Sequence, residues 1–534
     1  MSASLPSWPP TLTSLQREEL HKSATTWALS HGLCYLPPST SDRPSNSTSS
    51  PPVATIHAPI SLIPTPFPRS LFHSAQSLQS VYNTLYSRVA LDTEFLDRYM
   101  GCESEEGVGK VDSFTGKLWQ GWKTVREEGG YERQSLHLGL FRSDYLLHTS
   151  PDQALSIKQV EFNTISSSFG PLSERIAALH RHLAASCSYY DISPLLNDDR
   201  FPENETTKGL VQGLASAHGA YGVPSARILF VVQSKERNMF DQKWLEYELL
   251  ERHSIKVIRR SLDELATQAC VDPNTYSLLV SNTDSPNSPP IEISTIYFRA
   301  CYTPNDFPTL SHYETRFLLE RSRAIKCPSL PLQLAGGKKI QEVLTRPGVL
   351  EQFLPDVGHD SLEQLRATFM GMYSLDLDET NDSSSFPKTR ANHLNLVLKP
   401  QREGGGNNVY KEDIPAFLDS LSAVSSSSSP VSESKAWIAM EIIHTPPGIG
   451  GYLVRSPPPG SSQEEIEAGK GGAQAEIISE LGIFGYSLFG LVEGKKTIKG
   501  EETVGWLVRT KGKESNEGGV ATGFSVLDSL VLID

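Results

Sequence analysis

The spacing of hydrophobic and polar residues predicts a mixed α/β chain. Apolar residues recur every three to four positions across residues 15–30 and 69–90, which indicates two helices with one apolar face each. Two later runs, "HLGLFRSDYLLHTS" (137–150) and "LSIKQVEFNTISSSFG" (155–170), resemble strands and are separated by a turn at Pro151 and Asp152. We expect these two runs to be neighbouring strands of one sheet.

A different rhythm begins at residue 226. Strand-like and helix-like segments alternate up to residue 299, in the order "ARILFVVQ", "DQKWLEYELLERH", "IKVIRRS", "LDELATQA", "YSLLV" and "STIYFR". This alternation predicts a small parallel sheet covered by helices, in a module of its own. Helical patterns return in "YETRFLLERSRAIK" and "GGKKIQEVLTR". Two segments rich in serine, proline and glycine, residues 422–435 and 455–474, are expected to be surface loops.

Composition and charge narrow the class of protein. A chain of 534 residues with 38% hydrophobic and 21% charged residues is typical of a globular protein of several domains. No apolar run reaches the ~18 residues that span a bilayer, and the N-terminal segment lacks the pattern of a secretory signal. The six scattered cysteines contain no Cys-x-x-Cys pair, so we expect a reducing, cytoplasmic location without disulfides or a zinc site.

The net charge of -14 argues against nucleic acid and anionic membranes as partners. A site for an anionic ligand would therefore need its own local concentration of lysine, arginine and backbone amides. The stretch "VLKPQREGGGNNVY" (397–410) offers this combination, because successive glycines let several backbone N–H groups approach one phosphate. The alternative interpretation is a flexible surface hairpin.

Residues next to the three glycines favour a nucleotide site over that hairpin. Lys399 precedes the loop and can meet a phosphate, whereas Glu403 offers a hard oxygen for a divalent cation. Asn407 and Asn408 can bind polar groups or adopt left-handed backbone geometry. Neither a Walker A loop nor a G-x-G-x-x-G motif is present, so bound ATP requires another scaffold.

Two further segments supply polar side chains at strand-like spacing. In "VEFNTISSSFG", Glu161 and Asn163 share one face of a strand and could form half of a Mg²⁺ site; the alternative is a strand end that faces solvent. In "VRTKGKESNEGGVATGFSVLD", Arg509 and Lys511 also share a face and precede a second glycine-rich loop. Basic residues on a strand are often only solvated, but their position next to this loop makes a lid over a phosphate site conceivable.

Six motifs spread from about residue 140 to the C-terminus resemble those of eukaryotic glutathione synthetase: "EFNTISSSFG", "ERNMFDQ", "QLAGGKK", "LKPQREGGGNNVY", "SELGIFG" and "RTKGKESNEGGVATG". The resemblance implies an ATP-grasp fold of the α/β class, in which ATP lies between antiparallel sheets beside an inserted parallel α/β substrate domain. The implied domains are residues 1–225, the helical part and the first portion of the core; 226–335, the inserted domain; and 336–534, the rest of the core with glycine-rich loop 403–410 and lid loop 512–523.

The resemblance also implies a reaction and its participants. The expected enzyme is a ligase that joins γ-glutamylcysteine to glycine, with ATP as co-substrate and Mg²⁺ as cofactor, in a cytoplasmic homodimer. No protein nucleophile is needed, because the peptide carboxylate takes the γ-phosphoryl group and glycine attacks the acyl phosphate.

The site residues are carried over from the family by motif. The expected metal ligands are Glu161, Asn163 and Glu403, and the expected catalytic residues are Arg142, Arg509, Lys338 and Lys399. The ATP site is expected to comprise Glu161, Lys338, Lys399, Glu403, Gly404, Gly405, Gly406, Asn407, Asn408, Tyr410, Met440, Glu441, Ile442, Ile443, Glu480, Lys511 and Glu517. The peptide site is expected to comprise Arg142, Ser166, Ser168, Glu236, Arg237, Asn238, Gln242, Arg299, Tyr302, Arg509, Val520 and Ala521.

The chain departs from the family pattern at a few positions. Ile442 stands where members of the family have lysine, and Glu517 where they have aspartate. Ala300 and Cys301 replace a glycine-containing turn. Two other functions stay open at this point: a related ligase that uses another acceptor such as β-alanine or serine, and an inactive nucleotide-binding scaffold.

Overall fold

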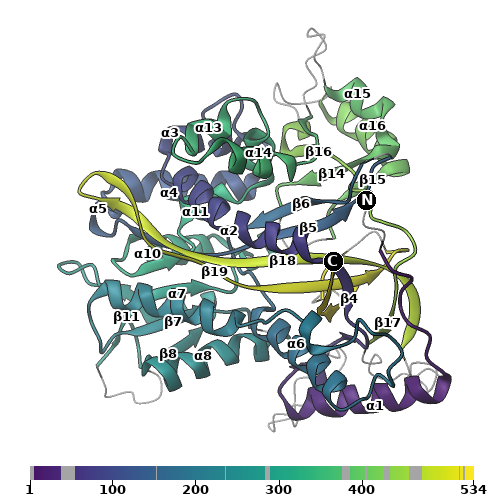
Figure 1. Cartoon of the computed structure of the whole chain (residues 1–534). Helices are drawn as coiled ribbons and strands as arrows, with labels where there is room; N and C mark the ends of the chain where they lie inside the picture. The colour runs from purple at the N-terminus through teal and green to yellow at the C-terminus, as the bar shows by residue number, and fades with distance from the viewer. Residues whose placement is uncertain are drawn as a thin grey trace, which may run out of the picture.

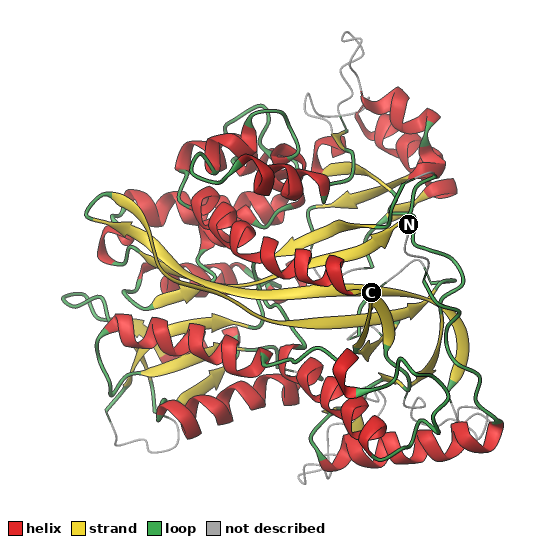
Figure 2. Ribbon diagram, viewed as in Figure 1, coloured by secondary structure: helices red, strands yellow, loops and turns green. Residues whose placement is uncertain are grey.

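A computed structural model describes residues 5–37, 55–151, 153–234, 236–282, 289–375, 385–402, 406–425, 433–455, 472–515, 518–520 and 523–534. One long sheet crosses the middle of the molecule, helices lie on both sides of it, and a smaller sheet stands beside it (Figures 1 and 2). This arrangement confirms the predicted α/β class. No described helix combines the length and the apolar character needed to cross a membrane.

Within the described residues, thirteen strands form the large sheet. Its main path runs β17-β3-β20-β19-β18-β5-β12-β11-β10-β9, while β6 pairs with β5, β7 with β11, and β8 with β7. The predicted pairing of the runs at 137–150 and 155–170 is confirmed as β5 and β6. The strands are β3 (Ile60–Ser61), β5 (Leu136–His148), β6 (Ser156–Asn163), β7 (Arg227–Val231), β8 (Val257–Arg260), β9 (Ala269–Val271), β10 (Leu278–Val280), β11 (Ile291–Phe298), β12 (Ile325–Cys327), β17 (Gly450–Val454), β18 (Ala473–Val492), β19 (Lys495–Gly512) and β20 (Ser525–Asp528).

The region predicted as a parallel sheet is only partly parallel. Strands β7, β8, β11 and β12 run parallel to one another, but β10 pairs antiparallel with both β9 and β11. The prediction failed at β10 because the chain between β9 and β10 is a short turn, and two strands joined by so short a connection run antiparallel. Strand β12 also pairs with β5, so this region continues the sheet of the rest of the chain. The domain boundaries at 226 and 336 stay predictions.

The smaller sheet is antiparallel, in the order β13-β16-β14-β15. Alternate residues of β14 face two ways: Leu396 and Leu398 pack with Ile414 of helix α16, whereas Val397 and Lys399 face a cavity. The bounds are β13 (Met372–Ser374), β14 (Leu396–Pro400), β15 (Val409–Tyr410), β16 (Trp437–Glu441) and α16 (Ile414–Ser425). Two short pairs complete the described strands: β1 (Cys34–Tyr35) with β2 (Ile56–His57), and β4 (Thr65–Pro68) with β21 (Leu530–Ile533).

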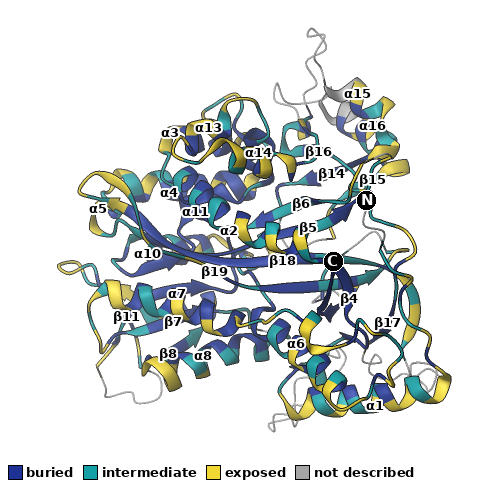
Figure 3. Ribbon diagram, in the orientation of Figure 1, coloured by how far each residue is buried: buried dark blue, intermediate teal, exposed yellow. Residues whose placement is uncertain are grey.

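The middle of strand β18, residues 481–490, is buried on both of its faces (Figure 3). A Cβ at Gly485 would lie 2.6 Å from Asn83 of α2, so this residue faces α2. Its neighbour Tyr486 faces the other way, because a Cβ at Gly213 of α7 would lie 2.9 Å from the Tyr486 ring. The sheet therefore separates two hydrophobic cores, one against α2 and one against α6 and α7. These helices are α2 (Arg69–Ala90), α6 (Gly170–Ala185) and α7 (Thr206–Tyr221).

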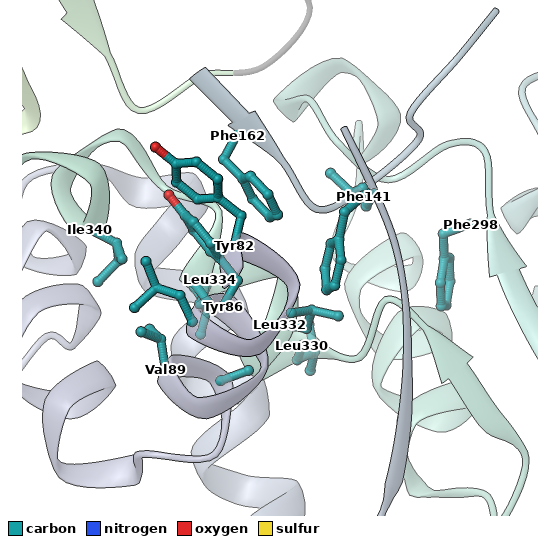
Figure 4. Close-up of a cluster of buried hydrophobic side chains, with 14 of the residues drawn as sticks. Tyr82, Tyr86, Val89, Phe141, Phe162, Phe298, Leu330, Leu332, Leu334 and Ile340 are labelled. Carbon is teal, nitrogen blue, oxygen red and sulfur yellow. The ribbon is translucent and has the colours of Figure 1, made fainter. Parts of the chain in front are cut away.

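The core against α2 is rich in aromatic rings (Figure 4). Phe162 of β6 stacks on Tyr86 with ring centroids 3.9 Å apart and on Tyr82 at 5.6 Å. Phe141 of β5 lies 5.2 Å from the same ring. This aromatic cluster packs against one face of β5 and β6. It therefore holds in place the side chains on the opposite face of the two strands.

The predicted helices are confirmed with shifts of a few residues at their ends, except that the segment "YETRFLLERSRAIK" leaves its helix at Arg321 and ends in strand β12. Helix α1 begins with a capping box, in which Thr13 Oγ1 accepts from Gln16 N and Gln16 Oε1 accepts from Thr13 N. Within the described residues, the other α-helices are α1 (Ser14–Ser30), α3 (Thr93–Met100), α4 (Ser113–Glu127), α5 (Gly130–Arg133), α8 (Met239–His253), α9 (Leu262–Gln268), α10 (Leu310–Arg321), α11 (Leu330–Ala335), α12 (Lys338–Leu344), α13 (Val349–Phe353), α14 (His359–Ala367) and α15 (Ser385–Ala391).

Candidate active site

A cavity of about 760 Å³ lies between the large sheet and the smaller sheet. Strands β5, β6, β18 and β19 contribute one side, and β14, β15 and β16 contribute the other. Among the described lining residues six are cationic and three are acidic, in a chain whose net charge is -14. The predicted site residues that line it are Arg142, Glu161, Asn163, Ser166, Ser168, Tyr302, Lys338, Lys399, Asn407, Asn408, Tyr410, Met440, Glu441, Ile442, Ile443, Glu480, Arg509, Lys511 and Val520.

Glu161 brings the two lysines of the predicted ATP site together. Its Oε2 lies 3.0 Å from Lys338 Nζ, at the start of α12. Lys399 Nζ donates to the backbone oxygen of Val160 at 2.9 Å, so its ammonium lies next to the same strand. Burial alone would raise the pKa of the Glu161 carboxyl, but Lys338, Lys399 and Arg509 hold it well below the usual range. Glu161 is therefore an anion between cations.

Two arginines from different strands meet at one buried carboxylate. Arg142 Nε and one of its terminal nitrogens donate to Asp144 at 2.6 and 2.8 Å, and Arg509 donates to Asp144 at 2.8 Å. Arg509 also pairs with Glu480, which stands opposite it on β18. Burial, together with the nearby Asp144 and Glu161, raises the pKa of the Glu480 carboxyl despite this arginine.

Asp144 was missed by the sequence analysis. The alternation of β5 could have found it, because a residue two positions after Arg142 shares its face of the strand. Its side chain is fully buried and does not line the cavity. Motif spacing alone does not tell whether a residue lines the cavity or lies buried behind the residues that do.

The turn between β6 and α6 holds the predicted peptide-binding serines. Ser166 has φ 51°, and its hydroxyl donates to the Phe298 backbone oxygen at 3.1 Å. Arg299 lies behind this turn, where it donates to Ser167 O at 2.9 Å and to Ser168 Oγ at 2.7 Å. Arg299 does not line the cavity, so the structure places it in support of the serines.

Asp241 was also missed. Its carboxylate accepts from the backbone N–H groups of Phe169 and Leu172 at the start of α6, at 2.8 and 3.3 Å. It lies 3.6 Å from Arg299, and both side chains are almost fully buried. The acceptor role at a helix N-terminus is typical of aspartate, but here the helix and the residue are far apart in sequence.

The predicted peptide-site residues on the "ERNMFDQ" motif form a hydrogen-bonded group outside the cavity lining. Glu236 accepts from Asn238 N and from Gln242 Nε2, both at 2.7 Å. Arg237 lies against the N-terminal segment, with its Nε donating to Leu36 O at 3.3 Å. Gly406, which has φ 79°, also lies outside the lining. These five residues therefore do not line the cavity beside Arg142 and Arg509.

The sequence motifs that supply the cavity residues match those of a known protein family. The family model "Eukaryotic glutathione synthase, ATP binding domain" matches residues 14–532. The chain belongs to the eukaryotic glutathione synthase family. It is 38% identical to the glutathione synthetase of Bos taurus over 515 residues, which cover 96% of each chain. It is also 38% identical to the chloroplastic glutathione synthetase of Solanum lycopersicum, over 97% of this chain and 84% of that protein.

The fold is shared with a solved structure of more distant sequence. A glutathione synthetase-like effector of Globodera pallida superposes with a TM-score of 0.69 at 23% identity, over 98% of both chains. The similarity supports an ATP-grasp-type arrangement of the two sheets.

Two departures from the glutathione synthase pattern lie in the described part of the chain. Cys301 has φ 75°, a left-handed conformation that favours glycine, so this chain carries a side chain in the geometry of the family's glycine-containing turn. Ile442 lines the cavity, and its backbone N–H donates to Asn395 O at 2.8 Å. Five predicted site residues lie outside the described residues: Glu403, Gly404, Gly405, Glu517 and Ala521.

The donor atoms suit the cation that glutathione synthases are expected to use. Glu161 and Asn163 both line the cavity from one face of β6. Asn163 Nδ2 donates to Asp144 at 2.9 Å, which commits the nitrogen of the amide and leaves its oxygen as the atom that can bind a metal. No cluster of three or more histidine, cysteine or acidic residues able to hold a metal occurs among the described residues. Mg²⁺ fits this pattern, because it binds through one or two protein groups and completes its shell with phosphates and water.

Proposed function

We propose that this chain is a glutathione synthetase that ligates γ-glutamylcysteine with glycine and converts ATP to ADP and phosphate. The observation that supports it most strongly is the cavity between the two sheets, which gathers cationic side chains in a chain of net negative charge. Phosphoryl transfer from ATP requires neutralisation of phosphate charge and accurate positioning more than it requires a protein nucleophile.

ATP is proposed to lie between the two sheets. Lys338, Lys399 and Lys511 approach the cavity from three different elements and would contact the phosphates. Residues 440–443 also line the cavity, with apolar side chains at three of the four positions, and would hold the adenine ring. The glycine-rich loop 403–410 would supply further backbone donors.

Mg²⁺ is proposed to be held by Glu161, Asn163 and Glu403. When bound, the ion neutralises phosphate charge and so favours transfer of the γ-phosphoryl group. The protein's own part is to keep Glu161 ionised, which the adjacent lysines do, and to turn the Asn163 amide oxygen toward the cavity.

Arg142 and Arg509 are proposed to bind the reacting carboxylate of the peptide. A carboxylate oxygen attacks the γ-phosphorus, the bond to the bridging oxygen of ADP breaks, and an acyl phosphate forms. The glycine nitrogen then attacks the acyl carbon, phosphate leaves, and the amine loses a proton. The guanidinium groups stabilise the negative charge on the oxygens throughout.

The decisive test is ADP release from the purified protein with ATP and Mg²⁺, adding γ-glutamylcysteine and glycine separately and together. Release that requires both, with the tripeptide as product, supports the proposal. If β-alanine or serine outcompetes glycine at equal concentration, the chain is a related ligase with another acceptor. ATP binding without ADP release would indicate an inactive scaffold.

We also propose that the protein is a cytoplasmic homodimer, as the family resemblance implies. Sedimentation velocity at several protein concentrations tests the dimer, and a mass of a single chain at all of them would contradict it. Fractionation of cells expressing the tagged full-length chain tests the compartment. A relative from Solanum lycopersicum is described as chloroplastic, so organelle fractions belong in that experiment.

A further inference from the structure

Asp144 contacts three residues of the cavity without lining it. Its two carboxylate oxygens accept from Arg142, Arg509 and Asn163, at 2.6 to 2.9 Å. The side chain is 0% exposed. We propose that Asp144 is a positioning residue, which fixes both arginines for the peptide carboxylate and orients the Asn163 amide for the metal. This inference rests on the proposed function, because that function gives the three residues their roles.

The hydrogen bonds of Arg142 hold its guanidinium group in one orientation. Two of its nitrogens donate to the two oxygens of Asp144, a paired contact that fixes the plane of the guanidinium. The remaining terminal nitrogen donates to Ser168 O at 3.2 Å, which links the arginine to the peptide-binding turn. A free arginine side chain would have to be ordered by each incoming substrate, whereas this one is held beforehand.

Arg509 reaches Asp144 from the strand on the other side of β18. Arg142 and Arg509 come from β5 and β19, and the Asp144 carboxylate accepts hydrogen bonds from both of them. Without an anion between them, the two guanidinium groups would repel each other. Asn163, opposite Arg142 on β6, is held by the same oxygen as Arg509.

A second observation shows that the fold makes room for this arrangement. Gly482 of β18 stands opposite Asp144 on β5. A Cβ at Gly482 would lie 2.8 Å from Arg142 Cδ and 2.8 Å from Asp144 Oδ1. The glycine is therefore needed for the close approach of the Arg142 and Asp144 side chains, and not for a left-handed backbone.

The test compares Asp144→Asn with the wild-type protein. Asparagine keeps the shape of the side chain but loses its charge and one of its acceptors, so the two arginines lose their common partner. We expect the Kd for γ-glutamylcysteine, measured by calorimetry, to rise about tenfold or more, while the Kd for ATP at saturating Mg²⁺ stays within about threefold. Asp144→Glu should not restore peptide binding, because the longer side chain cannot occupy the space above Gly482.

Two control variants separate positioning from general loss of stability. Glu320→Gln breaks a fully buried pair with Arg316 outside the cavity, and should lower the Tm without changing the ratio of the two dissociation constants. Gly482→Ala should reproduce the selective loss of peptide affinity seen in Asp144→Asn. Gly500→Ala, on the same hairpin, should not, because its Cβ would meet only the Tyr486 ring at 3.8 Å or beyond.

Each outcome has one meaning. Peptide affinity within twofold of wild type in Asp144→Asn overturns the inference, as does an equal loss of peptide and ATP affinity. If Asp144→Asn does not fold, the comparison of Gly482→Ala with Gly500→Ala decides the question. A wild-type protein that binds the peptide but makes no tripeptide contradicts the proposed function alone, and a wild-type protein that does not bind the peptide contradicts both.

Discussion

Asp528 shows how an acidic side chain behaves when hydroxyl groups are its partners. Its carboxylate accepts from Thr65 Oγ1 and Thr510 Oγ1, both at 2.7 Å, and from Ser529 N at 2.7 Å. No cation pairs with it among the described residues. Burial raises its pKa to about 7, and the hydrogen bonds offset only part of that increase.

This shift predicts a dependence of stability on pH. The folded state retains the proton of Asp528 up to about pH 7, whereas the unfolded chain releases it near about pH 4, so folding is favoured most below pH 4. The contribution is lost as pH rises from about 4 to 7, by at most about 4 kcal/mol. In Asp528→Asn this loss should be absent, so the Tm of the variant relative to wild type should increase with pH. The fully exposed Asp360→Asn is the control, and parallel Tm curves for Asp528→Asn and wild type would contradict the prediction.

A substitution at Glu161 should change how activity depends on the Mg²⁺ concentration. Glu161→Gln removes the charge that the proposed Mg²⁺ site needs and the ion pair with Lys338, which is 4% exposed. The Mg²⁺ concentration for half-maximal ADP release should rise about tenfold or more. Glu264→Gln, which removes only a cap of α9, should leave the Mg²⁺ requirement unchanged. Equal Mg²⁺ titrations for Glu161→Gln and wild type would rule out a role in metal binding.

At the scale of elements, a single strand can serve the hydrophobic core with one face and the site with the other. On β6 the side chains of Glu161 and Asn163 face the cavity, while Phe162 between them enters the aromatic core against α2. The positions of the polar groups are thus set by packing on the reverse side of the same strand.

Phe162→Ala tests this coupling. The ring is 2% exposed and contacts Tyr82, Tyr86 and Phe141, so truncation should cost about 3–5 kcal/mol of unfolding free energy. Urea unfolding followed by tryptophan fluorescence measures this cost. Leu310→Ala, at a side chain that is 68% exposed, should change stability by less than about 0.5 kcal/mol. A shift for Phe162→Ala no larger than that of the control would mean that the cluster does not hold β6.

Period-two alternation explains which parts of the site could be predicted from sequence. Glu161 with Asn163 and Arg509 with Lys511 were expected to share faces, and each pair does line the cavity. The same alternation places Asp144 on the face of Arg142, but the roles of Asp144 and Asp241 depend on partners from strands and helices distant in sequence. The antiparallel direction of β10 was likewise not visible in the alternation, because hydrophobic pattern reports burial and not strand direction.

At the scale of the whole molecule, the cavity lies between two sheets that have separate hydrophobic cores. The smaller sheet packs through its own clusters around α16 and β16, apart from the two cores of the large sheet. Lys399 is a direct link between them, since it belongs to β14 and donates to Val160 of β6. A ligand that contacts lysines of both sheets should therefore stabilise their relative position.

Hydrogen exchange with and without ATP and Mg²⁺ tests this consequence. A ligand that binds the folded state at about 100 times its Kd adds about 2.7 kcal/mol of stability, which should slow exchange where opening separates the sheets. We expect protection in β6, β14 and β16, and none in β8 or α9, which contribute no residue to the cavity lining. Lys399→Met should reduce the protection in β14, because the phosphates lose one of their cationic contacts on the smaller sheet. Protection confined to the large sheet in the wild-type protein would show that ATP does not lie between the two sheets.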